Sequence, residues 1–173
     1  MNIRPAIPED AHAIAHIHVA SWQATYPGLV PQHYIDALDA NEFTERWRDR
    51  LLNDMAVSIC VAEIDDALIG FASGGPIRKP IAHCDGELYA IYLLPSMQRK
   101  GAGRALVKHI ESELRKQGRS HILAWVLRDN PATSFYQRLG GKVVAEDIVE
   151  IGGAHLPELA YAWTFGAPGQ TQP

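Results

Sequence analysis

The fold is decided by the stretch Glu87-Leu88-Tyr89-Ala90-Ile91-Tyr92-Leu93-Leu94-Pro95-Ser96-Met97-Gln98-Arg99-Lys100-Gly101-Ala102-Gly103-Arg104-Ala105-Leu106. Residues 87–94 are apolar on both alternating faces except at Glu87, which is typical of a central strand covered on both sides. Pro95 ends the strand because proline has no N–H to donate to the ladder. From Ala102 onward apolar residues recur at helical spacing, so the stretch predicts a strand, a glycine-containing turn and a helix.

The turn between strand and helix has the chemistry of an anion site. Free N–H groups at a helix start carry partial positive charge, and the bare backbone at Gly101 and Gly103 lets a phosphate approach them closely. Arg99, Lys100 and Arg104 add full positive charges around the same place. The turn therefore predicts a pyrophosphate site.

Two common phosphate-binding patterns do not fit this turn. The dinucleotide fingerprint G-x-G-x-x-G lacks its third glycine, because Leu106 stands at that position. The loop G-x-x-x-x-G-K-[ST] is absent from the sequence. A nucleotide-binding oxidoreductase is therefore a disfavoured alternative.

The segment Gln98-Arg99-Lys100-Gly101-Ala102-Gly103 resembles the Q/R-x-x-G-x-G/A signature of the GCN5-related N-acetyltransferases (GNAT), in which this turn holds the pyrophosphate of acetyl-CoA. Glu87, eleven residues before Gln98, stands where family members often carry a catalytic carboxylate. Residues 130–140 resemble the second coenzyme-contacting segment of the family. The similarity covers about residues 56–165. It implies acetyl-CoA as co-substrate, no metal, and coenzyme contacts from Ile91, Leu93, Gln98, Arg99, Lys100, Gly101, Ala102, Gly103, Arg104 and Asn130.

The pattern along the chain predicts an α+β fold of three layers in a single domain, residues 1–165, with 166–173 as a frayed tail. Strands are expected at 2–6, 55–64, 67–75, 87–94, 121–127, 142–151 and 156–165, and helices at about 11–24, 31–38, 41–53, 102–116 and 131–139. Pro157 indicates an edge strand or a bulge. The resemblance implies a mixed, mostly antiparallel sheet that splays between its fourth and fifth strands to admit the pantetheine arm.

Moving an acetyl group from a thioester to an amine requires a neutral amine and a proton for the departing thiolate. The resemblance implies that Tyr136 donates that proton, because a phenol titrating near ~10 stays protonated at neutral pH. It implies Glu87 as the general base and backbone groups near Ile91 and Leu93 as partners of the donor. Core packing of Tyr136 and a solvent-facing Glu87 stay open as alternatives, with Asp85 or Glu150 as other carboxylates. Asn130 fits a helix cap as well as a contact to the pantetheine arm.

Aromatic residues of the N-terminal third are candidates for the acceptor site. In the family, the first helices form one wall of the acceptor pocket, which implies substrate contacts from Trp22, Tyr26 and Tyr34; a core role is the alternative for each. A small-molecule primary amine is the expected acceptor, attacking directly in a ternary complex. A protein N-terminus or lysine, or a non-catalytic acyl-CoA sensor, are the other hypotheses.

Composition narrows the remaining possibilities. The net charge of −4 without a basic block gives no footprint for nucleic acid. No window is long and apolar enough to cross a bilayer and no signal peptide is recognisable, so we expect a cytoplasmic protein. Cys60 and Cys84 have no zinc or disulfide spacing.

Two further features invite interpretation. His12, His16 and His18 share a predicted helix, but no carboxylate or cysteine completes a metal set, so packed or solvated side chains are expected. Tyr161, Trp163 and Phe165 in the last strand fit a homodimer interface or the core equally well.

Overall fold

The computed structural model describes residues 1–81 and 83–165, so the predicted tail at 166–173 lies outside the described residues. The strands are β1 (Asn2–Pro5), β2 (Ser58–Ile64), β3 (Ala67–Pro76), β4 (Gly86–Leu93), β5 (His121–Leu127), β6 (Lys142–Ile151) and β7 (Ala154–Thr164). The helices are α1 (Ala11–Thr25), α2 (Gln32–Asp36), α3 (Ala40–Asn53), α4 (Ala102–Lys116) and α5 (Thr133–Arg138), with short 3-10 turns η1 (Pro8–Asp10) and η2 (Pro95–Met97).

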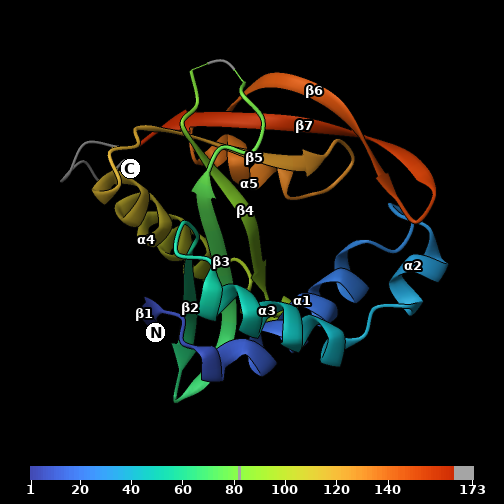
Figure 1. Ribbon diagram of the computed structural model, residues 1–173. Coiled ribbons are helices and arrows are strands. Elements are labelled where there is room, and N and C mark those ends of the chain that lie inside the picture. The colour runs from blue at the N-terminus through green and yellow to red at the C-terminus, as the bar shows by residue number, and fades with distance from the viewer. Residues whose placement is uncertain (82, 166–173) are drawn as a thin grey trace.

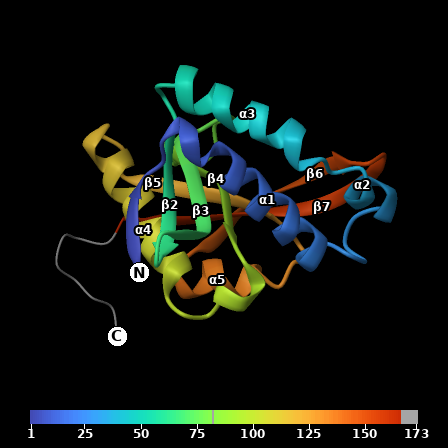
Figure 2. The ribbon, with the colours of Figure 1, turned by 90° about the horizontal axis from the view of Figure 1, so that it is seen from below.

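The strands form one seven-stranded sheet in the order β1-β2-β3-β4-β5-β7-β6. Neighbouring strands are antiparallel except for β4 and β5, which run parallel. Helices α1 and α3 cover one face, whereas α4 and α5 cover the other (Figures 1 and 2). The predicted α+β architecture with a mixed, mostly antiparallel sheet is confirmed.

The sheet opens between β4 and β5. These strands pair only at Gly86 with Ile122 and Glu87 with Leu123, near their N-terminal ends. On the other side of β4 the register shifts, because Ser73 faces Ala90 whereas Gly74 faces Leu88. Tyr89 is therefore the extra residue of a bulge, and bulges bend the strand that carries them. The predicted splay between the fourth and fifth strands is confirmed.

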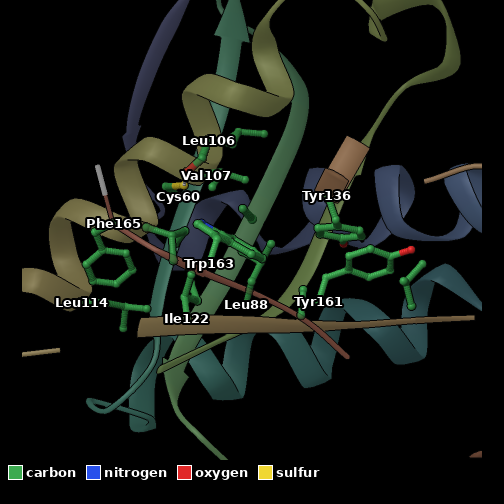
Figure 3. Packing of buried hydrophobic residues seen from close by; sticks show 14 of the residues in the cluster. Cys60, Leu88, Leu106, Val107, Leu114, Ile122, Tyr136, Tyr161, Trp163 and Phe165 are labelled. Carbon is green, nitrogen blue, oxygen red and sulfur yellow. Dashed lines mark hydrogen bonds between the residues drawn. The ribbon is translucent and has the colours of Figure 1, made fainter. Parts of the chain in front are cut away.

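The larger core lies between the sheet and α4. Leu106, Val107 and Leu114 project from α4 toward strand residues such as Leu88 and Ile122 (Figure 3). All five side chains are at most 3% exposed. Full burial of each such side chain contributes about 1.5–3 kcal/mol, so this layer fixes α4, and with it the glycine turn, on the sheet.

The opposite face holds a second core and a smaller third one. Ile14 of α1, Trp47 of α3 and Phe71 of β3 are buried together in the second. In the third, α2 meets the hairpin of β6 and β7, whose tip lies beside α2 in both views (Figures 1 and 2). A Cβ at Gly152 of that tip would lie 2.8 Å from the Tyr34 Cβ, so only glycine permits this contact.

Strand β7 is internal, contrary to the edge position that Pro157 suggested. The ladder between β5 and β7 ends where Leu127 faces Glu158, one residue before Pro157. The Pro157 carbonyl still accepts the Arg128 N–H at 2.9 Å. The missing N–H of the proline thus falls just past the end of β5, where no ladder partner is needed. Among the described residues, no helix is long and apolar enough to cross a membrane.

Candidate active site

A cavity of about 710 Å³ passes through the opening between β4 and β5. Its size is within the usual range for small-molecule sites. Residues of α1, β4, β5, α5, β6 and β7 line it, together with the turn before α4. Because the sheet is open at this point, side chains from both of its faces reach one cavity.

The glycine turn forms one end of the cavity. Gln98, Arg99, Gly101, Gly103 and Arg104 line it, and their contacts to a coenzyme stay predictions. The turn is built from left-handed backbone, with φ of 61° at Arg99 and 87° at Gly101. At Gly101 the glycine adopts this conformation at little cost, and the residue leads directly into the first turn of α4 with its free N–H groups.

Two of the predicted contacts do not line the cavity. The Ala102 side chain is 1% exposed and belongs to the core under α4. Lys100 is exposed, with its Nζ 3.9 Å from the Met97 Sδ. A contact from Lys100 to a bound coenzyme, and one from the Ala102 backbone, stay predictions.

Gly103 keeps space open where α4 meets α5. A Cβ there would lie 3.3 Å from the Phe135 ring and 3.4 Å from Leu93. Nearby, the Arg104 guanidinium donates to the Arg138 carbonyl at 3.2 Å and so joins the two helices. Arg138 also lines the cavity. Arg138 is thus a third arginine at the glycine-turn end of the cavity. The sequence did not predict it because it lies on α5, far along the chain from the turn.

Ile91 and Leu93 of β4 line the cavity, and their predicted contacts to a coenzyme stay predictions. The Leu93 carbonyl accepts hydrogen bonds from Ser21 Oγ at 3.2 Å and from Gln98 Nε2 at 3.4 Å. Beyond Glu87 the β4 edge has no ladder partner on β5. It therefore leaves backbone groups for a ligand that enters the opening.

Asn130 lies after β5 and is 3% exposed. Its Oδ1 accepts the Ala132 N–H at 2.8 Å, which orders the turn into α5, and the residue also lines the cavity. The two roles that the sequence suggested are therefore compatible.

Tyr136 lines the cavity and is 6% exposed. Its ring stacks on Tyr161 with centroids 5.9 Å apart (Figure 3). Burial raises the pKa of the Tyr136 phenol far above its ordinary value, and Tyr26 acts in the same direction. The phenol therefore keeps its proton at neutral pH, as a proton donor must.

The aromatic wall comes from α1 and β4. Trp22 and Tyr26 line the cavity and stack with centroids 4.2 Å apart, and the Trp22 Nε1 donates to the Tyr92 hydroxyl at 2.9 Å. Tyr34 is placed differently: it packs behind Trp22 and against Gly152 rather than lining the cavity. Burial raises the pKa of both Tyr26 and Tyr92.

His18 supports this wall from behind. Its ring stacks on Tyr92 with centroids 4.8 Å apart and meets Phe43 edge-on at 4.5 Å. The Trp47 Nε1 donates to the His18 Nδ1 at 3.3 Å. Burial lowers the pKa of His18 to about 4, so the imidazole is neutral at neutral pH.

Glu87 does not line the cavity. Glu87 is 1% exposed, so the alternative in which its carboxylate faces solvent is wrong. The Arg78 Nε donates to Glu87 Oε1 at 3.0 Å, the Arg78 backbone N–H donates to Oε2 at 3.0 Å, and the Arg78 Nη2 also contacts Oε1. The carboxylate is thus occupied by a loop residue that covers it, and its role as the base stays a prediction.

The two alternative carboxylates have other surroundings. Asp85 accepts the backbone N–H groups of Ser120 and His121 at 3.0 and 2.9 Å, which makes it a turn-forming residue. Glu150 is exposed on β6 and does not line the cavity.

Glu158 is the acidic residue that sequence reasoning missed. It lies on β7, is half-buried and lines the cavity. Burial raises the pKa of its carboxyl, and the charge of Asp147 acts in the same direction. The available signal was a lone charge within the apolar run 156–165. Trp125 and Tyr92 were missed as lining residues too, because alternation alone does not say which face of a strand borders a cavity.

Among the described residues that line the cavity, there is no histidine and no cysteine. Within residues 1–81 and 83–165, no group of three or more histidine, cysteine or acidic side chains is placed to hold a metal ion. His12 and His16 form an exposed pair with Nε2 atoms 3.2 Å apart. Burial raises the pKa of the Cys60 thiol to about 12 and also raises that of Cys84, so neither thiol is activated as a nucleophile.

Comparison of the sequence with known proteins identifies the family of the chain. The model of the acetyltransferase (GNAT) family matches residues 13–141. The uncharacterized N-acetyltransferase YuaI of Bacillus subtilis (strain 168) is 41% identical over 163 residues, which cover 94% of this chain and 92% of the relative. The spermidine N(1)-acetyltransferase of Thermoplasma acidophilum is 28% identical over 155 residues, or 85% of this chain and 91% of the relative.

Solved structures share the fold. The PaiA N-acetyltransferase of Thermoplasma acidophilum in complex with coenzyme A superposes with a TM-score of 0.75 at 24% identity, covering 95% of this chain and 98% of the other. YncA of Salmonella typhimurium with acetyl-CoA gives 0.71 at 22% identity, covering 99% and 98%. Because the family model matches most of its length and a relative is 41% identical across nearly all of it, this chain belongs to the acetyltransferase (GNAT) family and is an N-acetyltransferase.

Proposed function

We propose that the protein transfers the acetyl group of acetyl-CoA to a small primary amine, which attacks directly in a ternary complex. The observation that carries this proposal is the charge distribution in one cavity. Arg99, Arg104 and Arg138 line the end at the glycine turn, whereas Glu158 is the carboxylate among the described lining residues. An anionic pyrophosphate suits the first end and a cationic amine the other.

The donor end fits a coenzyme for steric reasons as well. The left-handed backbone at Gly101, where no atom lies within 4 Å of the missing Cβ, leaves the first turn of α4 open to a phosphate. Ile91 and Leu93 border the opening in the sheet, where a pantetheine arm would find backbone partners, and Asn130 lies across it. The coenzyme-bound structural neighbours support acetyl-CoA as the co-substrate.

The transfer itself needs three proton movements. A carboxylate takes one proton from the ammonium group, and the neutral amine then attacks the thioester carbonyl. When the C–S bond breaks, the Tyr136 hydroxyl gives its proton to the thiolate, and the phenolate takes up the remaining excess proton from the new amide nitrogen. The products are the acetylated amine, free coenzyme A and one proton released to water. In this proposal Tyr136 is the general acid.

We favour a small amine over a peptide because the β6–β7 hairpin packs against α2 beside the acceptor end. The tip of the β6–β7 hairpin packs on α2 through Gly152 and Tyr34, and Val149 and Ile151 join the same apolar cluster. An extended peptide would need an open groove between these elements. Trp22, Tyr26 and Tyr92 supply an aromatic wall, which attracts alkylammonium groups. The relative named for spermidine acetylation also supports a small amine.

An acceptor panel tests this proposal. Release of free thiol from acetyl-CoA would be measured with spermidine, lysine and phenethylamine, and with a short peptide that has a free N-terminus. We expect at least one small amine to be turned over with a higher kcat/KM than the peptide. Turnover of the peptide alone would favour the protein-acetylating alternative. Coenzyme binding without any acceptor-dependent release would favour the sensor. A cytoplasmic location and a homodimer stay predictions.

A further inference from the structure

Two glutamates lie near the acceptor end of the cavity, and their surroundings differ. Both oxygens of Glu87 are held by Arg78, and Glu87 does not line the cavity. Glu158 lines the cavity, and within the described residues its carboxylate has no hydrogen bond and no ion pair. A half-buried carboxylate without a partner normally finds one or has a functional reason to lack it.

The sheet register aims Glu158 toward the acceptor side. Glu158 faces Leu127 of β5 and Asp147 of β6, so all three share the face covered by α1 and α2. Trp125, two residues before Leu127, lies on that face as well and lines the cavity. The carboxylate is therefore set among apolar and aromatic walls, on the opposite side of the opened sheet from α4 and its arginine-lined turn.

Two charged groups near Glu158 are paired with residues other than Glu158. Asp147 is already paired with Lys79, and Arg78 is already paired with Glu87. Burial, together with the negative charges of Asp147 and Glu87, raises the pKa of Glu158, whereas Arg78 and Lys79 oppose that change. A carboxylate of raised pKa is a stronger base than an ordinary glutamate.

We propose that Glu158 on β7, rather than the buried and arginine-paired Glu87, is the general base that takes the proton from the ammonium group of the acceptor. One N–H bond of the ammonium breaks, the proton joins a Glu158 oxygen, and the freed lone pair forms the C–N bond with the thioester carbon. Glu158 then releases the proton to water. This inference rests on the proposed acetyl transfer to a small amine.

The test compares the parent enzyme with Glu158→Gln, using the best amine of the panel. We expect kcat to fall by about 10²- to 10³-fold. The decrease of kcat/KM at acidic pH should also disappear, because the amide cannot accept the proton. Glu146→Gln on neighbouring β6 is the matched control. Glu146 is exposed, pairs with Arg128 and does not line the cavity, so the control should keep the parental profile.

Several outcomes would overturn the assignment. A rise in KM at unchanged kcat in Glu158→Gln would show that Glu158 only binds the ammonium group. Loss of the decrease in kcat/KM at acidic pH in Glu87→Gln, but not in Glu158→Gln, would show that Glu87 is the base. Acetyl-CoA affinity equal to that of the parent shows that the variant is folded. If the parent acetylates no amine, the proposed function fails together with the inference; if it does and Glu158→Gln matches it, only the inference fails.

A second measurement needs no acceptor. Titration of the Glu158 side-chain carboxyl by ¹³C NMR in the coenzyme-free protein should give a midpoint above 4.5, the ordinary pKa of a glutamate. A midpoint at or below this value would show a carboxylate stabilised by partners, which contradicts the assignment.

Discussion

Protonation of His18 should destabilise the folded protein between about pH 6.5 and about pH 4. The pKa of His18 falls from 6.5 to about 4 through burial in the folded state. On acidification the unfolded chain therefore binds a proton before the folded chain does. Stability is unaffected above pH 6.5 and decreases as the pH falls through the window between the two values.

The magnitude follows from that difference. A lowering of the pKa by about 2.5 corresponds to about 3 kcal/mol of unfolding free energy, lost by the time the pH reaches the folded-state value. The physical cause lies in the packing: the His18 Nδ1 accepts from Trp47, and the ring stacks on Tyr92 and meets Phe43. A proton on Nδ1 would face the N–H donor of Trp47 in a site where burial disfavours the charged imidazole.

Urea unfolding followed by tryptophan fluorescence, at several values between about pH 4 and about pH 7, would measure the effect. His18→Phe keeps an aromatic ring but cannot titrate, so its stability should fall less steeply on acidification than that of the parent, by up to about 3 kcal/mol over the window. His12→Gln removes an exposed imidazole from the same helix and should alter the slope less. Parallel curves for the parent and His18→Phe would refute the reasoning.

Three further predictions concern the site and its support. Tyr136→Phe should lower kcat by about 10²-fold while acetyl-CoA affinity, measured by calorimetry, changes little, because only the proton donor is lost; an unchanged kcat would exclude Tyr136 as the acid. Gly101→Ala should lower the unfolding free energy by about 1–2 kcal/mol, since φ there is 87° and no atom lies within 4 Å of the added Cβ; equal stability would contradict the backbone argument. Glu87→Gln should cost about 2 kcal/mol in a urea titration by weakening the charged hydrogen bonds to Arg78, and a stable variant would show that this pair is dispensable.

Local signals were sufficient for the central part of the fold. The apolar strand at 86–93, the turn at Gly101 and α4 each follow from residues adjacent in sequence, and the structure has them where the pattern predicted. The opening of the sheet was implied by the family resemblance rather than by periodicity. Its structural signs are a β4–β5 ladder of two residue pairs and a bulge at Tyr89. Both depend on pairing between strands, so no single segment of the sequence predicts them.

Pairing between distant segments decided what the sequence could not show. Glu87 was expected at the reaction centre, but Arg78 of the preceding loop reaches back to it. Glu158 enters the cavity because β7 inserts between β5 and β6, a strand order that the chain order does not reveal. Tyr34 supports the hairpin tip instead of lining the cavity, which depends on the close approach at Gly152.

The central claim is direct attack of an amine on acetyl-CoA, and the initial-velocity pattern tests it most directly. Thiol release would be measured over a matrix of acetyl-CoA and amine concentrations with the best acceptor of the panel. The account predicts double-reciprocal lines that intersect, because both substrates must occupy the cavity together and the thiols of Cys60 and Cys84 are not activated. Parallel lines, which indicate a covalent acetyl-enzyme, would contradict it.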